Sequence, residues 1–381
     1  MPITETPKVR YFESDSNPTL DGDGAQIPIF IGISGNATPT AGIQRFKNFQ
    51  ACYKTVENGG IGTTLESNPL LSAVNEFFQE AKKTNSEDTG VPYIYVIDLG
   101  TATTDTAKTW TDAMALAKSK REVQVEIYCG FKKEDTAANI ISIMESAIES
   151  IVTDSESGNP RTAYFTVSGV TDAELMAFTD DSEDVYIQNT RVGLIEPKYF
   201  GKTVAKICTT PYWEEPGYTD FRSIAPGEFG NRTPEEENTL QDAGIIFIRD
   251  EIASSEIHPR INLAVSTAFA TNPDNRANDA LLHARRNVDN LVRRVYDTLY
   301  SQLKRNETET NISFLQSDID VVVEDEISKG YMMNGTELEV LESETNPFDL
   351  KVEGVAVPVN STLLIGFSLY VESPNAVSGG N

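Results

Sequence analysis

Strand and helix patterns alternate along the first half of this chain, and the alternation limits the folds that it can adopt. Short apolar runs typical of strands cover 27–35, 91–98, 123–129 and 163–167. Apolar residues at helical spacing lie between them and predict helices that begin at Asn68 and run over 108–119 and 136–152. Helices that alternate with strands pack as layers on a sheet. The first half is therefore expected to form an α/β layer.

The pattern changes in the middle of the chain. Thr171–Glu174 matches a capping box and predicts a short helix, and Val185–Ile187 is expected to form a strand. Residues 209–239 then carry four prolines among charged and aromatic residues: Pro211, Pro216, Pro226 and Pro234. Such a stretch is typical of a long ordered loop or a crossing between domains. We expect a domain boundary there.

The second half mixes helices with short strands. Helices are predicted over 234–242, 276–305 and 313–329, with Gly244 and Gly330 ending the first and the last. Strands are predicted over 245–248, 261–265, 337–342, 348–352, 354–358 and 363–371. The fold class is thus mixed α/β and α+β. The expected divisions are an N-terminal arm (1–24), an α/β domain (25–233), an α+β domain (234–362) and a C-terminal strand arm with its tail (363–381).

Both ends of the chain carry alternating segments. Near the C-terminus, the apolar residues of one strand face are Ile365, Phe367, Leu369 and Val371. Lys8–Tyr11 alternates as well, and the turn-forming run 17–24 follows it. A strand at a chain end pairs readily with a neighbouring subunit, because its backbone groups need partners. The sequence therefore predicts two arms that reach other copies of the chain.

Charge and hydropathy exclude several classes of function. The net charge of −27, from 58 acidic and 31 basic residues among 381, argues against direct nucleic-acid binding, which needs a positive field. The acidity fits adaptation to salt, solubility through self-repulsion, or the outer surface of a particle. No run approaches the roughly 20 apolar residues of a membrane span, and no signal peptide is evident, so folding in a cytosol without membrane insertion is expected. The three cysteines, Cys52, Cys129 and Cys208, are expected to be reduced.

Signals for catalysis are scarce. His258 and His283 have no cysteine or second histidine at metal-ligand spacing, and we expect them in a turn and at a helix surface or interface. The glycine-rich stretch 58–63 lacks the Gly-Lys-Ser/Thr ending of a phosphate loop and predicts a flexible turn. The sequence therefore predicts no enzyme, no catalytic residue, no metal and no cofactor. The Asn-x-Ser/Thr triplets are expected to be unmodified.

A basic helix stands out in this acidic chain. Residues 276–305 hold seven positive and three negative residues. On helical spacing, Arg286, Arg293 and Arg294 should project away from the apolar valines of the helix, and Arg285 precedes them. One interpretation is a solvated face or pairing with acidic groups of the same chain. The other is a positive strip that faces an acidic partner.

The order and spacing of several motifs resemble those of contractile-tail sheath proteins, over nearly the whole chain. The N-terminal motifs are Ile29–Ile33, Gly42–Phe46 leading to Gly59-Gly60, Leu70–Phe78 and Tyr93–Ile97. The C-terminal motifs are Ala243–Ile246, Ala264–Ala268, Arg286–Leu291, Gly330–Met332 and the closing strands. The size of the chain resembles that of the compact members without large insertions.

This resemblance implies a structural subunit that polymerises helically around an inner tail tube and contracts to drive the tube through a cell envelope for genome delivery. It implies sixfold rings, a baseplate and a tail terminator as further partners, and a virion tail location after assembly in the host cytoplasm. It places the 25–233 domain outside and the 234–362 domain against the tube, with Arg285, Arg286, Arg293 and Arg294 as a tube-facing strip. Val9 and Tyr11 would belong to one inter-subunit arm, and Phe367, Leu369 and Val371 to the other.

Two alternatives remain open at the level of sequence. A non-viral contractile injection device would share all of these features. A soluble α/β enzyme that binds a small molecule between two domains is favoured only by the general architecture, and the missing catalytic constellation counts against it.

Overall fold

The computed structural model describes nine segments of the chain: 25–81, 91–102, 107–156, 158–230, 232–253, 256–271, 280–300, 309–342 and 350–359. Both predicted arms, 1–24 and 363–381, lie outside the described residues. The arm residues Val9, Tyr11, Phe367, Leu369 and Val371 therefore keep the status of predictions.

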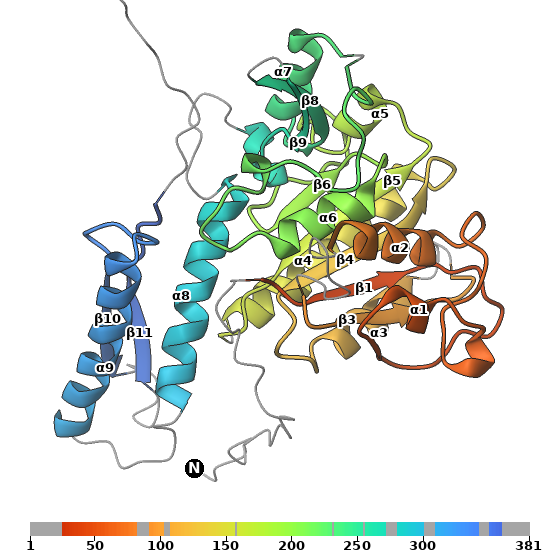
Figure 1. The fold of residues 1–381 in the computed structure, drawn as a ribbon. Helices are drawn as coiled ribbons and strands as arrows, with labels where there is room; N and C mark the ends of the chain where they lie inside the picture. The colour runs from red at the N-terminus through yellow and green to blue at the C-terminus, as the bar shows by residue number, and fades with distance from the viewer. Residues whose placement is uncertain are drawn as a thin grey trace, which may run out of the picture.

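A seven-stranded sheet forms the centre of the molecule, in the order β2-β3-β1-β4-β5-β6-β7 (Figure 1). Every pair in it is parallel except β2–β3 at one edge. The strands are β1 (Pro28–Gly32), β2 (Gln44–Phe46), β3 (Ile94–Asp98), β4 (Val125–Lys132), β5 (Thr162–Ser168), β6 (Val192–Ile195) and β7 (Ile245–Ile246). The predicted α/β layer is confirmed.

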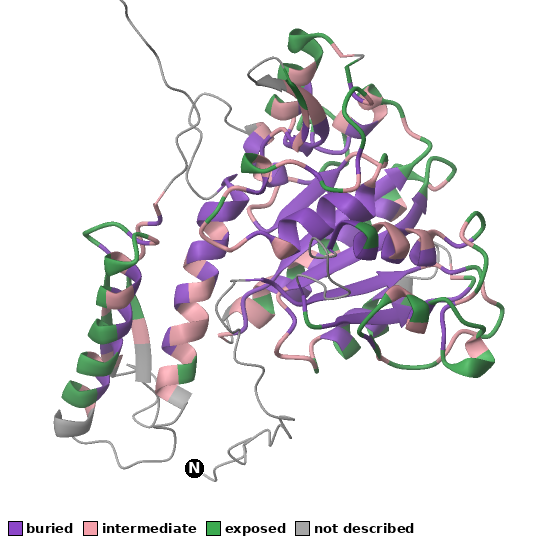
Figure 2. Ribbon diagram, in the orientation of Figure 1, coloured by how far each residue is buried: buried purple, intermediate pink, exposed green. Residues whose placement is uncertain are grey.

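Helices cover both faces of this sheet. One face packs on α2 (Pro69–Ala81) and α6 (Phe200–Thr209), and the other on α3 (Ala107–Ala117) and α4 (Ala137–Glu156). In β1, Phe30 enters the first core, whereas Ile29 and Ile31 enter the second. Strands buried on both faces explain why their sequences are runs of apolar residues (Figure 2).

Shorter elements complete this α/β body, which we define as the described residues between 25 and 271. They are α1 (Phe49–Cys52), α5 (Asp172–Met176), α7 (Pro234–Asp242) and the antiparallel hairpin of β8 (Ile248–Ala253) and β9 (Glu256–Ile261). The predicted capping box of Thr171 and Glu174 is present, and α7 has the predicted bounds. Gly244 follows α7 at φ 72°, the left-handed conformation that favours glycine.

The C-terminal part forms a separate, smaller layer. Helix α8 (Leu282–Tyr300) lies between the body and a layer made of α9 (Glu309–Ser328) and the antiparallel pair β10 (Glu337–Glu342) and β11 (Leu350–Val355) (Figure 1). A third core, with Leu291 and Val295 of α8, Ile319 of α9 and Val340 of β10, holds them together. We call α9, β10 and β11 the hairpin unit.

Several predicted elements differ from the structure. Residues 185–187 form no strand, and Val185 and Tyr186 are exposed; the strand of this region is β6 instead. Residues 245–248 divide between β7 and β8, the 261–265 strand is only the end of β9, and the strands predicted at 348–352 and 354–358 are one strand, β11. Helix α6 was not predicted. The sheet also continues past the boundary expected at 233, because β7 pairs with β6.

Candidate functional site

Helix α8 connects the two parts of the molecule. Its first turn, with Leu282 and Ala284, belongs to the core of the α/β body, and Leu291 and Val295 further along belong to the core of the hairpin unit. The basic residues singled out by the sequence all lie on this helix. Their contacts therefore decide whether they form one strip.

Arg285 and Arg286 bind within the subunit. Arg285 Nε lies 3.2 Å from Asp289 Oδ1, and the other oxygen of this carboxylate, Oδ2, accepts from Arg191 Nη1 at 2.9 Å. The Arg286 side chain is only 1 % exposed, and its Nη2 donates to the backbone carbonyl of Thr210. Burial lowers the pKa of the Arg286 guanidinium from its usual value. Arg286 therefore lies inside the subunit and pairs there, which is one of the two alternatives that the sequence left open.

Arg293 fixes α8 to the body through backbone carbonyls. Its Nη1 donates to Arg121 O at 3.2 Å, and its Nη2 donates to Val123 O at 3.1 Å and Pro160 O at 2.5 Å. Burial lowers the pKa of Arg293 to about 10. The planar guanidinium serves three acceptors at once, so it orients the helix against the connections that lead into β4 and β5.

Arg294 points to the hairpin unit. It donates through Nη2 to Asp325 Oδ2 at 2.6 Å and through Nη1 to Glu326 Oε1, which also accepts from Asn290 Nδ2 at 3.2 Å. Glu326 is fully buried. Because a buried carboxylate requires partners, this cluster ties α9 to α8.

The four arginines thus point to different parts of the subunit. The described contacts match the alternative in which they pair within the chain, rather than one continuous exposed strip. Their predicted tube-facing role stays a prediction, since no tube protein is part of this structure.

The proline-containing stretch 209–233 is an ordered loop held by charged side chains of α2 and α6. Glu80 accepts from the backbone of Arg222 at 2.9 Å and from the backbone and hydroxyl of Ser223 at 3.0 and 2.7 Å. Lys202 Nζ donates to Ser223 O, and Lys206 Nζ donates to Asp220 O, each at 2.8 Å. The stretch predicted as a loop over 209–239 is a loop only as far as residue 233, because α7 begins at Pro234, and the missed helix α6 supplies two of the side chains that order it.

Both histidines contact carboxylates of this loop. His283 Nδ1 lies 3.0 Å from Glu215 Oε2 and is 1 % exposed, so it is a buried group rather than a surface group. His258 Nδ1 lies 2.6 Å from Asp220 Oδ2, and it belongs to β9 rather than to a turn. No cluster of metal-ligating side chains occurs in the part of the chain that the structure describes. Nor is any described helix long and apolar enough to cross a bilayer.

Aromatic side chains join the same loop to the hairpin unit. Trp213 stacks on Tyr331, which follows α9, with ring centroids 4.7 Å apart, and Tyr212 contacts both rings edge-on. Together with Arg294 and Glu326, this contact sets the position of the hairpin unit on the body.

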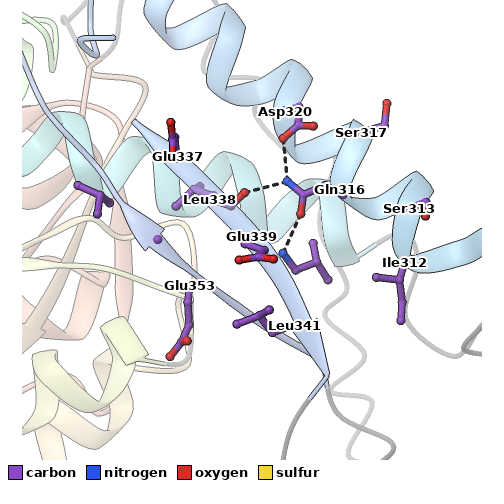
Figure 3. Close-up of a pocket in the computed structure, with 13 residues that line it drawn as sticks. Ile312, Ser313, Gln316, Ser317, Asp320, Glu337, Leu338, Glu339, Leu341 and Glu353 are labelled. Carbon is purple, nitrogen blue, oxygen red and sulfur yellow. Dashed lines mark hydrogen bonds between the residues drawn. The ribbon is translucent and has the colours of Figure 1, made fainter. Parts of the chain in front are cut away.

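The hairpin unit carries a groove of about 770 Å³ between α9 and the β10–β11 pair (Figure 3). Gln316 of α9 points into it, and its side-chain amide meets the backbone of β10. Four acidic residues line the groove: Asp320, Glu337, Glu339 and Glu353. The groove combines these carboxylates with apolar residues such as Leu338 and Val355, and its lining residues include no histidine, cysteine or lysine.

No family model and no curated protein matches the sequence, but solved structures match its fold over nearly the full length. The helical sheath of the anti-feeding prophage in its contracted state has a TM-score of 0.63 at 12 % identity, covering 97 % of this chain and 100 % of that chain. This is the fold of contractile sheath proteins. The PVC sheath complex of an extracellular contractile injection system gives 0.63 at 11 % identity, covering 98 % and 99 %. A sheath tail protein from Listeria innocua gives 0.60 at 8 % identity, covering 89 % and 93 %.

Helix α8 was predicted from the sequence, but the acceptor groups that bind its arginines were not. Thr210 O, Arg121 O and Pro160 O are carbonyls, which carry no sequence signal. Gln316 also escaped notice, because a glutamine on a helix has no distinguishing pattern. The acidic partners of Arg294 at Asp325 and Glu326 lie on a helix that was predicted, and charge matching between the two helices could have indicated that pair.

Proposed function

We propose that this chain is the structural subunit of a contractile tail sheath, which polymerises helically around an inner tube and contracts to drive that tube through a cell envelope. The observation that carries the proposal is the extent of the fold likeness, which covers 97 % of this chain and 100 % of the anti-feeding prophage sheath. A shared domain alone would leave part of one chain unmatched. Here both layers, the α/β body and the hairpin unit, fall within the match.

The chemistry of the described residues supports a mechanical role. Charged side chains act as links between elements, as the half-buried Arg293 does between α8 and the body and the buried Glu326 does between α8 and α9. A substrate site would need polar groups that converge on a cavity, with a nucleophile beside a base. The residues that line the groove between α9 and the β10–β11 pair include no histidine, cysteine or lysine.

Strand exchange between subunits is the second part of the proposal. The alternating segments with Val9 and Tyr11 and with Phe367, Leu369 and Val371 would add strands to sheets of neighbouring copies. Backbone hydrogen bonds of this kind keep subunits linked while their other contacts change. Sixfold rings, a baseplate, a tail terminator and a tube are the partners that this assembly implies.

Electron microscopy of the purified full-length chain tests the proposal. We expect hollow tubes with a helical repeat, either from the chain alone or after coexpression with a tube protein. A chain that stays monomeric at high concentration and also with the tube protein would overturn the sheath assignment.

The tube-facing prediction has its sharpest test in Arg285, whose substitution leaves the carbonyl contacts of Arg286 and Arg293 intact. If α8 faces the tube, Arg285→Ala should weaken assembly on the tube but spare self-polymerisation. Lys54→Ala, at an exposed position of the α/β body, is the matched control. Equal tube binding by both variants would contradict an inner role for Arg285.

Both a phage tail and a non-viral injection device fit this fold, since the matched structures include a sheath tail protein and an extracellular contractile injection system. Genome delivery is the function in the first case. Capsid genes next to the sheath and tube genes would assign the chain to a virus, and their absence would assign it to a device.

A further inference from the structure

Two Asn-Gly pairs lie among the described residues, at Asn58-Gly59 and at Asn334-Gly335. An asparagine followed by glycine is chemically labile, because the glycine nitrogen, which no side chain shields, can attack the side-chain amide of the asparagine. All four residues are exposed. The local backbone structure therefore decides which of the two pairs reacts.

The first pair is held by hydrogen bonds at the end of a 3-10 helix over residues 56–58. Gly59 N donates to Val56 O at 2.9 Å, and Asn58 Nδ2 donates to Thr55 Oγ1 at 2.7 Å. The nitrogen that would attack and the amide that would be attacked are therefore both bound. Each of these hydrogen bonds must break before the two groups can meet.

The second pair occupies the middle of a β-turn between α9 and β10. Thr336 N donates to Met333 O at 3.2 Å and closes the turn, and Gly335 has φ 100°, which favours glycine. The peptide unit between the two central residues of a β-turn takes no part in the closing hydrogen bond. Among the described residues, neither Gly335 N nor the Asn334 side chain has a hydrogen-bond partner. Both reacting groups of this pair are thus free.

We propose that Asn334 is a site of spontaneous deamidation. Gly335 N forms a bond to Asn334 Cγ, the Cγ–Nδ2 bond breaks, and the side-chain nitrogen leaves as ammonia with the proton of Gly335 N. Water then opens the resulting succinimide ring at either carbonyl and leaves aspartate or isoaspartate, with no atom oxidised or reduced. The reaction needs no enzyme, so it is independent of glycosylation, although Asn334 also begins an Asn-x-Thr triplet.

The structure around the turn gives this modification a consequence. Both ends of the turn bind one residue that follows β11: Met333 N donates to Val357 O at 2.8 Å, and Val357 N donates to Thr336 Oγ1 at 3.0 Å. Isoaspartate adds one carbon to the main chain between these two anchors, whereas aspartate adds only a charge. The isoaspartate product should therefore loosen the contact of the turn with Val357.

Peptide mass spectrometry of the full-length chain, incubated in mildly alkaline buffer, tests the proposal. Base favours the reaction because Gly335 N must lose its proton. Asn334 should convert about tenfold faster than Asn58 in the folded chain, because only its reacting groups are free to meet. In denaturant the two pairs should convert at similar rates, since both are then Asn-Gly in an unfolded chain.

The matched variant is Thr55→Ala, which removes the partner of the Asn58 amide and should accelerate conversion at Asn58 alone. Similar conversion of the two pairs in the folded natural chain would overturn the proposal. Absence of product at Asn334, over a time in which the denatured chain reacts, would overturn it as well. Neither result bears on the sheath function, because this inference does not depend on it.

Hydrogen exchange tests the consequence for the turn. In a chain that has accumulated isoaspartate at position 334, the amide of Val357 should exchange about tenfold faster than in the fresh chain. Asn334→Asp carries the new charge at the natural main-chain length, and it should leave this exchange rate unchanged. Equal rates in the isoaspartate chain and in the Asn334→Asp variant would contradict the loosening of the turn.

Discussion

The sheets of the α/β body and of the hairpin unit are covered by helices to different extents. The body covers both faces of seven strands with helices and buries nearly every strand residue. The hairpin unit covers one face of two strands, and its described residues 309–342 and 350–359 hold ten acidic and only two basic residues. A sheet of the first kind is complete in one subunit, whereas a sheet of the second kind gains stability from a partner.

The contacts that α8 makes with the body and with the hairpin unit also differ in kind. Arg293 binds backbone carbonyls of the body, which no side-chain substitution can remove, and Arg294 binds the carboxylates Asp325 and Glu326 of the hairpin unit. We therefore expect α8 to stay with the body when contacts to the hairpin unit are weakened. Substitutions in the body, between α8 and α9, and at the aromatic contact test how firmly each part is held. We rank them by their expected effect on the free energy of unfolding, from the largest to the smallest.

The largest loss is expected in the centre of the body. Phe165 of β5 is fully buried and stacks on Tyr128 with ring centroids 4.6 Å apart. Phe165→Ala should lower the free energy of unfolding by about 3–5 kcal/mol, because it removes a buried ring and leaves a cavity. Denaturant unfolding followed by circular dichroism measures this loss. A loss below that of the Glu326 variant described next would contradict the ranking.

An intermediate loss is expected where α8 meets α9. Glu326→Ala removes the buried acceptor of Arg294 and Asn290 and should cost about 1.5–3 kcal/mol, the range for hydrogen bonds to charged groups. Hydrogen exchange should accelerate in α9 and β10 but not in β4 or β5. Asp318→Asn, at an exposed position of the same helix, is the matched control. Equal exchange in the two variants would show that Glu326 does not hold the hairpin unit.

A smaller effect is expected at the aromatic contact. Trp213→Ala and Tyr331→Ala, alone and combined, should give a coupling free energy of about 0.5–1.5 kcal/mol, because their rings stack face to face. Tyr218→Ala tests an exposed aromatic residue of the same loop. Full additivity of the Trp213 and Tyr331 losses would mean that the ring contact contributes nothing specific.

The smallest effect on the monomer is expected from the C-terminal arm. Deleting 363–381 should leave the thermal midpoint of the monomer unchanged and abolish long tubes in electron micrographs, because this segment is proposed to act between subunits. Deleting only 373–381 keeps the alternating strand and should spare the tubes. If the variant that lacks 363–381 still forms ordinary tubes, strand exchange by this arm would be contradicted.

The sequence predicts elements well where local signals are strong. Helix α7 has the predicted bounds because Thr233 caps it, Pro234 starts it and Gly244 follows it in a left-handed conformation. Helix α6 has no such signal, since its N-cap is Tyr199 at φ 58° without a side-chain cap. Its second residue, Gly201, packs so closely on α2 that a Cβ there would lie 2.1 Å from Ala73 O. The glycine is needed in this helix because of a tertiary contact with α2, and the local sequence pattern does not show such a contact.

The arginine helix shows the same limit for the candidate site. Periodicity located α8 and its charges, but the partners of Arg286 and Arg293 lie 76 to 172 residues away in the chain. Helical spacing describes directions around one helix, and it contains no information on which distant element packs there. The sequence therefore predicted the helix and the positions of its charges, whereas the partners of Arg286 and Arg293 follow from the tertiary fold.

The side chain of Gln316 has a consequence for the geometry of any assembly that this chain builds. By occupying Leu338 O and Val340 N, it lowers the valency of the β10–β11 sheet, that is, the number of strand edges that its described residues offer to a further strand, by the edge of β10. A building block that accepts a single strand at this sheet extends a chain of subunits without branching. Gln316→Ala would restore the second valency, and lateral, branched aggregates would be its signature.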